Sequence, residues 1–123
     1  MRKISLLFTT FLLVSCYQQE RNCADFRTGK FKFEHEIDGQ TKVTYFERKD
    51  SLEIENYEGK IDSSHVRWIN DCEYVLHKIN PKNRHERKGV HIKILTTHEN
   101  TYTFEFNMVG DTNKQKGKVE KIE

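Results

Sequence analysis

The sequence has no long apolar run, which limits how the chain can meet a membrane. Its one strongly apolar stretch, residues 4–14, covers about eleven positions, whereas a helix that spans a bilayer needs about 20. Hydrophobic residues make up only 35% of the chain and charged residues 33%. A domain of this composition has a thin core and a heavily charged surface, and we expect no membrane-spanning segment.

The short motifs of common enzyme classes are also absent. The chain has no GxSxG nucleophile motif, no phosphate-binding P-loop and no dinucleotide-binding GxGxxG sequence. Its six histidines form no HxH or HExxH pattern, and its cysteines form no CxxC pair of the kind that binds zinc. We therefore expect a protein that is not an enzyme and that has no metal ion or cofactor.

The first residues have the pattern of an export signal. A basic start at Arg2 and Lys3 precedes the apolar residues 4–14, which have the length of a signal-peptide core. The sequence Leu13-Val14-Ser15-Cys16 at the end of this stretch resembles the lipobox of bacterial lipoproteins.

That resemblance implies that the chain is cut before Cys16 and that this cysteine carries the lipid. Residues 1–15 are then a signal peptide, and residues 16–22 are a lipidated tether. Each buried CH₂ contributes about 0.8 kcal/mol, so several acyl chains hold a soluble domain firmly at a membrane surface. An ordinary signal peptide, in which Cys16 stands by chance, is the alternative.

Loss of the leader removes the net charge. The full chain has 21 Lys and Arg residues against 19 Asp and Glu residues, and loss of Arg2 and Lys3 leaves 19 of each sign. A neutral chain has no broad positive field that attracts nucleic acid, so we expect no nucleic-acid partner. We expect a monomer in the cell envelope, held at the outer membrane rather than the inner one and facing the periplasm or the exterior.

Lipidation of Cys16 leaves two cysteines, Cys23 and Cys72. Exported proteins meet an oxidising compartment, so these two are predicted to form a disulfide bond. A metal-binding pair or a reactive thiol is the alternative, which the wide spacing of the two cysteines does not favour.

Period-two alternation predicts a single all-β domain over residues 23–123. Alternating or apolar segments lie at residues 30–37, 43–46, 52–55, 66–68, 72–79, 90–94, 102–108 and 119–122. Only short connections separate them, so the strands are expected to be antiparallel. We predict an up-and-down meander of about eight strands that closes as a lipocalin-like barrel, with an open half-barrel or a two-sheet sandwich as the alternative.

The register of the first hairpin depends on the Asp38-Gly39 turn. A two-residue turn pairs Phe31 with Phe46, whereas a three-residue turn with a bulge pairs Phe33 with Tyr45. The two choices point opposite faces of the second strand into the barrel, and the sequence leaves both open.

An eight-stranded barrel is filled by side chains or holds one small ligand. Bulky candidates favour the filled core, and His35 fits a core or rim histidine better than a ligand contact. The candidate core or ligand-contacting residues are Phe31, Phe33, His35, Trp68, Tyr74, Tyr102, Phe104 and Phe106.

Two charged segments are expected on the surface. Glu53 and Glu55 alternate with Leu52 and Ile54, which predicts that both carboxylates face solvent. The long polar connection at residues 81–89 is a candidate contact loop for anionic groups, although such loops are often simply solvated. Its basic residues are Lys82, Arg84, Arg87 and Lys88.

A second resemblance covers most of residues 16–123. Asn22-Cys23, residues 67–76 (RWINDCEYVL) and residues 94–97 (ILTT) resemble a group of small bacterial lipoproteins with a lipocalin-like barrel. Members are sometimes labelled DNA topoisomerase IV. Strand passage needs a large multidomain enzyme with access to DNA, so we expect no such activity from an exported domain of about 100 residues.

Two hypotheses of function follow. The first is a membrane-anchored binding module for a small apolar ligand or an envelope component. The second is an accessory or structural protein that docks on another envelope protein. An apolar cavity of about 300 Å³ or more favours the first, and a packed interior with an exposed apolar patch favours the second.

Overall fold

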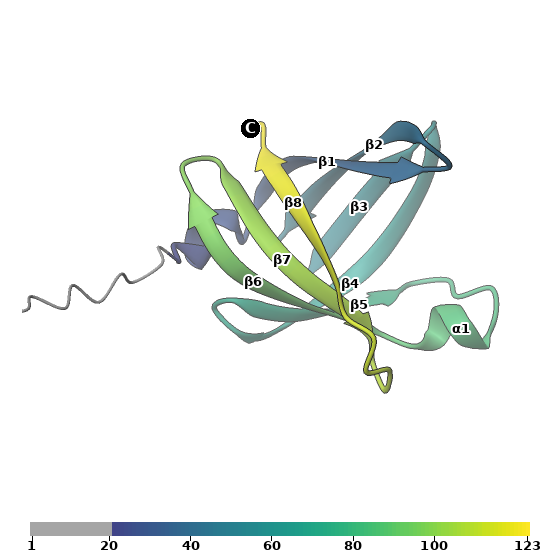
Figure 1. The fold of residues 1–123 in the computed structure, drawn as a ribbon. Coiled ribbons are helices and arrows are strands. Elements are labelled where there is room, and N and C mark those ends of the chain that lie inside the picture. The colour runs from purple at the N-terminus through teal and green to yellow at the C-terminus, as the bar shows by residue number, and fades with distance from the viewer. Residues whose placement is uncertain (1–20) are drawn as a thin grey trace, which may run out of the picture.

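The computed structural model describes residues 21–123 (Figure 1). The expected signal peptide and the proposed lipid site Cys16 lie outside these residues. The elements are a 3₁₀ helix η1 (Cys23–Phe26), strands β1 (Gly29–Ile37), β2 (Gln40–Lys49), β3 (Leu52–Tyr57), β4 (Lys60–Asn70) and β5 (Glu73–Lys78), a one-turn helix α1 (Arg84–Arg87), and strands β6 (Val90–His98), β7 (Thr101–Met108) and β8 (Gln115–Lys121). The alternation pattern predicts neither helix.

The eight strands form a closed antiparallel barrel. Each strand pairs with the next one along the chain, and β1 also pairs with β8 through Phe31, Lys32 and Phe33. The prediction of an up-and-down meander that closes as a barrel is therefore confirmed, and the open half-barrel and the two-sheet sandwich are excluded. No helix within residues 21–123 is long and apolar enough to cross a membrane.

The first hairpin has the two-residue turn. Ile37 pairs with Gln40, and Phe31 lies opposite Phe46. Asp38 and Gly39 have φ values of 52° and 76°, the left-handed conformation that a tight hairpin turn requires at both central positions. Phe46 therefore points into the barrel beside Phe31, and the bulged register is excluded.

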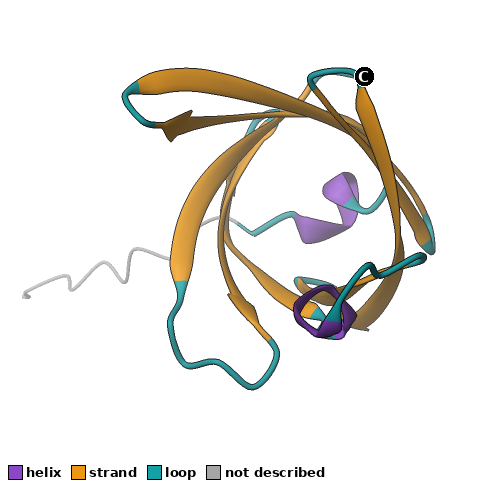
Figure 2. Ribbon diagram, turned by 90° about the vertical axis from the view of Figure 1, so that its right-hand side faces the viewer, coloured by secondary structure: helices purple, strands orange, loops and turns teal. Residues whose placement is uncertain are grey.

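The short helix η1 closes one end of the barrel, as the view along the barrel in Figure 2 shows. Phe26 is 1% exposed, and its ring centroid lies 5.0 Å from that of Tyr102 in edge-to-face contact. Just before η1, the Arg21 Nη2 donates to the Ile94 carbonyl at 2.9 Å. We call this the closed end. The opposite end, where β1–β2 and β3–β4 turn and where α1 lies, is the mouth.

The disulfide bond between Cys23 and Cys72 is present and lies at the closed end. It joins η1 to the turn between β4 and β5, so it fastens the entry of the chain to the barrel wall. The bridged residues are 49 positions apart, and loop-closure entropy for that length amounts to about 4 kcal/mol. The disulfide prediction is confirmed. The bond stabilises the attachment of η1 (Cys23–Phe26), the plug that closes this end of the barrel.

The barrel wall is least continuous at the mouth. Strand β5 pairs with β6 only through Glu73, Tyr74, Val75 and Leu76, so its last residues extend beyond the β6 ladder. Val75 points outward but is only 3% exposed, because the backbone at Gly89 covers it. Cover on the outside as well as the inside explains why β5 carries apolar side chains on both of its faces, with Tyr74 and Leu76 inside and Val75 outside.

Candidate ligand-binding cavity

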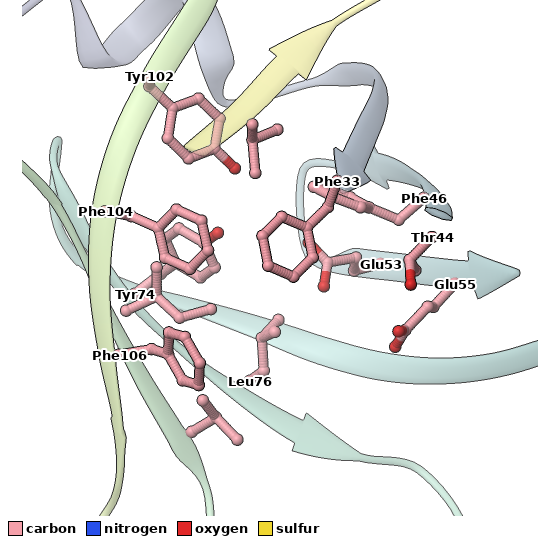
Figure 3. Close-up of a pocket in the computed structure, with 13 residues that line it drawn as sticks. Phe33, Thr44, Phe46, Glu53, Glu55, Tyr74, Leu76, Tyr102, Phe104 and Phe106 are labelled. Atoms are coloured by element: carbon pink, nitrogen blue, oxygen red, sulfur yellow. The ribbon is translucent and has the colours of Figure 1, made fainter. Parts of the chain in front are cut away.

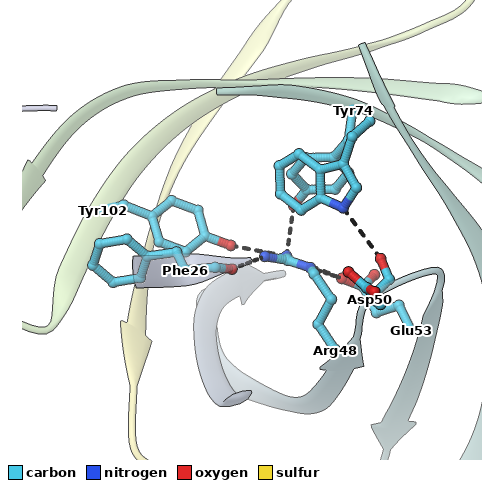
Figure 4. A network of polar contacts seen from close by, with 7 residues as sticks. Phe26, Arg48, Asp50, Glu53, Tyr74 and Tyr102 are labelled. Atoms are coloured by element: carbon cyan, nitrogen blue, oxygen red, sulfur yellow. Dashed lines mark hydrogen bonds and ion pairs between the residues drawn. The ribbon is translucent and has the colours of Figure 1, made fainter. Parts of the chain in front are cut away.

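A buried arginine forms the floor of the barrel interior (Figure 4). Arg48 is 1% exposed, and its Nε donates to Glu53 Oε1 at 3.1 Å. Its Nη1 donates to the carbonyl of Phe26 in η1 at 2.6 Å. Its Nη2 donates to the hydroxyl groups of Tyr74 at 2.6 Å and Tyr102 at 3.2 Å. One guanidinium thus connects β2, β3, β5, β7 and the plug.

Aromatic rings surround the same guanidinium. The Arg48 Cζ lies 4.6 Å from the ring centroid of Tyr74 and 4.8 Å from that of Phe31. The rings of Phe46 and Trp68 follow at 5.5 and 5.8 Å. Cation–π attraction is strongest where the cation is shielded from water, so these rings help to stabilise a charge that burial would otherwise disfavour.

The electrostatics of the floor favour a charged arginine. Burial alone lowers the pKa of Arg48, but Tyr74, Tyr102 and Glu53 outweigh it and raise this pKa above its usual range. Burial raises the pKa of Glu53, and the ion pair with Arg48 at 3.0 Å opposes that effect. Glu53 is only 8% exposed, so its carboxylate depends on Arg48 for its hydrogen bond and its counter-charge.

An apolar cavity lies above this floor, enclosed by the barrel wall (Figure 3). Its volume is about 160 Å³. Several of its side chains point inward and are still only half-buried, so their apolar surface faces the cavity rather than other side chains. These are Phe33, Phe46, Leu76 and Phe106. The interior is therefore not completely filled by side chains, which corrects the expectation of a filled core.

A wider and more polar space leads from this cavity to the mouth. This vestibule has a volume of about 350 Å³ and shares Phe33, Thr44 and Glu55 with the inner cavity as lining residues. Its remaining lining residues are His35, Ile37, Tyr57, Lys60, Asp62 and Lys78. The two spaces adjoin, so together they form a pocket with an apolar base and a polar entrance.

The structure turns Glu53 and Glu55 toward the barrel interior. The prediction that both carboxylates face solvent is therefore wrong for Glu53, which is buried, whereas Glu55 is exposed but reaches solvent through the pocket and not on the outer face. The β2–β3 register puts Glu53 opposite Arg48 and Glu55 opposite Phe46. Leu52 and Ile54 consequently lie on the outer face. Arg48 and Glu53 are equally far along the chain from the Asp50-Ser51 turn, so a two-residue turn places them opposite each other. This pair of opposite charges across the hairpin is the sequence signal that Glu53 points into the barrel beside Arg48.

Glu55 occupies the boundary between the inner cavity and the vestibule. It is open to solvent, and no hydrogen bond or ion pair joins its carboxylate to another side chain of residues 21–123. Partial burial and then the charges of Glu53 and Asp62 raise its pKa, while Lys78 opposes them.

The aromatic candidates divide between the floor, the inner cavity and the vestibule. Phe31 and Trp68 surround Arg48 below the cavity. The inner cavity is lined by Phe33, Tyr74, Tyr102, Phe104 and Phe106. His35 lines the vestibule, where it shares a hydrogen bond of 3.2 Å with Thr44 and stacks on Phe33 at 5.2 Å. Sequence reasoning did not identify Thr44, Phe46, Arg48, Leu76 or the inward glutamates.

The basic candidates lie apart from the cavity, on the connection between β5 and β6. Lys82, Arg84, Arg87 and Lys88 are exposed there, three of them in or beside α1. Asn83 caps this helix by accepting from the Glu86 backbone N–H at 2.8 Å. Glu86 in turn pairs with Lys78 at 3.2 Å, which ties the loop to the rim of the vestibule.

Within residues 21–123, no group of three or more His, Cys, Asp or Glu side chains is close enough together to hold a metal ion. Comparisons with protein-family models, with curated proteins and with solved structures find no match for this chain. Its functional interpretation therefore depends on the geometry of the cavity.

Proposed function

We propose that this protein is an exported, lipid-anchored binding module that takes up a small, largely apolar molecule through the mouth of its barrel. The observation that carries the proposal is the open pocket itself, with half-buried aromatic side chains around an inner cavity of about 160 Å³. Apolar cavities lined by aromatic residues with a few polar groups are the usual form of small-molecule sites.

The volumes limit the size of the ligand. A dry apolar cavity of about 150 Å³ takes up benzene, so the inner cavity matches one ring or a short branched chain. It is smaller than the 300 Å³ or so of a drug-sized site, and only the adjoining vestibule provides that space. The ligand is therefore a small molecule with an apolar end in the inner cavity and a polar end in the vestibule.

The anchor and the mouth lie at opposite ends in this proposal. The chain enters the barrel at the closed end, where Arg21 and Cys23 are fastened. The five steps from Cys16 to Arg21 span at most about 18 Å. A lipid on Cys16 would hold the closed end near the membrane and leave the mouth facing the aqueous compartment. Intact-mass analysis of membrane-extracted protein tests the anchor, and an unacylated Cys16 contradicts it.

Ligand-observed NMR with phenethyl alcohol, a neutral water-soluble ring compound, tests uptake by the full-length protein. We expect saturable binding that Leu76→Phe weakens, because a larger side chain at Leu76 narrows the inner cavity. Ile61→Phe is the matched control, since Ile61 is 68% exposed on the outside of the barrel. Absence of saturable binding, or equal binding by both variants, contradicts the proposal.

The outer face of the barrel offers a second candidate function, docking on another envelope protein. A shallow apolar depression of about 270 Å³ there includes Tyr45, Ile54, Ile61 and Ile122, three of which are among the exposed large hydrophobic residues. Ile61→Glu separates the two functions. It should abolish cross-linking to a partner if docking is the function, and it should leave binding of phenethyl alcohol unchanged.

A further inference from the structure

We infer that the bound molecule carries a protonated amine and that the carboxylate of Glu55 binds this ammonium group where the inner cavity meets the vestibule. The ligand is then a small primary amine with an apolar body. This inference rests on the proposed binding function and specifies the chemical group at the polar end of the ligand. The inference follows from three features: the pairing of charges in the barrel, the position of Glu55 and the rings around it.

Most of the charged side chains that face the interior already have a partner. Arg48 pairs with Glu53 at 3.0 Å, and Lys78 pairs with Asp62 at 2.9 Å and with Glu86 at 3.2 Å. Glu55 has no such partner within residues 21–123. Its carboxylate is thus available to a ligand without the loss of an existing ion pair.

The position of Glu55 matches the polar end of a ligand whose apolar end fills the inner cavity. Glu55 lines both spaces, and it lies opposite Phe46 in the β2–β3 ladder and opposite Asp62 in the β3–β4 ladder. Lys60 also lacks an ion pair within the described residues, but it is exposed at the rim and lines only the vestibule. A ligand seated in the inner cavity therefore meets Glu55 before it meets Lys60.

The rings around this boundary also favour a cation. Phe33 and Phe46 line the inner cavity, and Tyr57 and His35 line the vestibule with ring centroids 5.7 Å apart. The negative face of an aromatic ring attracts an ammonium group, and proteins recognise organic ammonium ligands with aromatic rings. An anionic ligand would instead be repelled by Glu55, and Lys78, the lysine whose charge acts on Glu55, is already paired with two carboxylates.

A matched ligand series on the unmodified full-length protein tests the inference. The series consists of phenethylamine, phenethyl alcohol and 3-phenylpropionate, which share a ring and a short chain and differ in the charge of the terminal group. Because Glu55 is open to solvent, we expect the amine to bind about five- to tenfold more tightly than the alcohol, and the carboxylate to bind most weakly.

Two variants locate the effect. Glu55→Gln should remove the preference for the amine and leave alcohol binding within about twofold. Glu36→Gln is the matched control, because Glu36 lies near the mouth on β1 and is exposed on the outer face. It should keep the full preference.

The outcomes separate the inference from the function on which it rests. If the alcohol binds as tightly as the amine, or if Glu55→Gln keeps the preference, the inference is wrong while ligand binding stands. If the carboxylate binds most tightly, Lys60 and not Glu55 selects the ligand. If none of the three compounds binds, the proposed function fails as well. A melting temperature of Glu55→Gln that is no lower than that of the natural protein shows that a loss of preference is not a loss of folding.

Discussion

The buried ion pair between Arg48 and Glu53 predicts that Glu53→Gln destabilises the natural protein but stabilises the Arg48→Met variant. In Arg48→Met, the carboxylate of Glu53 stays buried without a counter-charge or a hydrogen-bond donor. Breaking a buried pair in this way costs about 3–5 kcal/mol. That is a large part of the total of about 5–15 kcal/mol that stabilises a typical domain. The Phe26 carbonyl and the hydroxyl groups of Tyr74 and Tyr102 lose a donor in the same variant.

Glu53→Gln gives the second arm of this cycle. In the natural background it should destabilise the protein, because Arg48 then keeps a buried charge with no carboxylate opposite it. In the Arg48→Met background it should stabilise the protein, by about 1 kcal/mol or more, because a neutral amide needs no counter-charge. Urea unfolding of the four proteins at pH 7 measures the cycle.

The pH dependence provides a check on the same variant. Without Arg48, burial alone acts on Glu53 and raises its pKa further above the ordinary value of 4.5. A carboxyl group with a raised folded-state pKa favours the folded state at low pH, and this benefit is lost as pH rises through that pKa. Relative to the natural protein, Arg48→Met should therefore lose stability between pH 4.5 and neutral pH.

In the unfolding cycle, destabilisation by Glu53→Gln in both the natural and the Arg48→Met backgrounds would refute the reasoning.

Three further predictions concern the plug, the boundary carboxylate and the barrel interior. The double variant Cys23→Ser/Cys72→Ser should lower the free energy of unfolding by about 4 kcal/mol in urea, and an unchanged midpoint would contradict the role of the bridge. Glu55→Gln should raise stability at pH 7, because the raised pKa of Glu55 means that folding disfavours its ionised form. The difference in the free energy of unfolding between Glu55→Gln and the natural protein should grow as pH rises from 4.5 through the raised pKa of Glu55. A difference that does not change with pH would contradict this prediction. Gly117→Ala should cost about 1–3 kcal/mol, because a Cβ there would lie 2.8 Å from Phe104 Cζ and 3.0 Å from Phe33 Cε2. A change in the melting temperature of less than a degree would show that both rings move freely.

The sequence predicts the barrel because its evidence is local. Period-two alternation indicates the strands, and Asp38-Gly39 marks the turn of the first hairpin, although not its register. The disulfide prediction follows from the expected export signal and from the small number of cysteines. These features depend on neighbours in the chain, so they can be recognised without knowing how the barrel closes.

The site is harder to predict because its polar groups reverse the usual pattern. Alternation alone assigns carboxylates to the solvent. Glu53 lies inside only because Arg48 is opposite it and balances its negative charge. Arg48 itself is buried because a carbonyl of η1 and two tyrosines, 26 and 54 positions away, receive its hydrogen bonds. Contacts of this length are set by the closure of the barrel and not by any short motif.

The most direct test of the ligand pocket is a crystal structure of the protein under xenon pressure. Xenon enters dry apolar cavities of benzene size, and the inner cavity has that size. We predict a strong xenon peak between the Arg48 floor and the vestibule, among Phe33, Phe104 and Phe106. Xenon bound only in the outer depression around Ile61, or an interior with no peak and closed aromatic packing, would contradict the account.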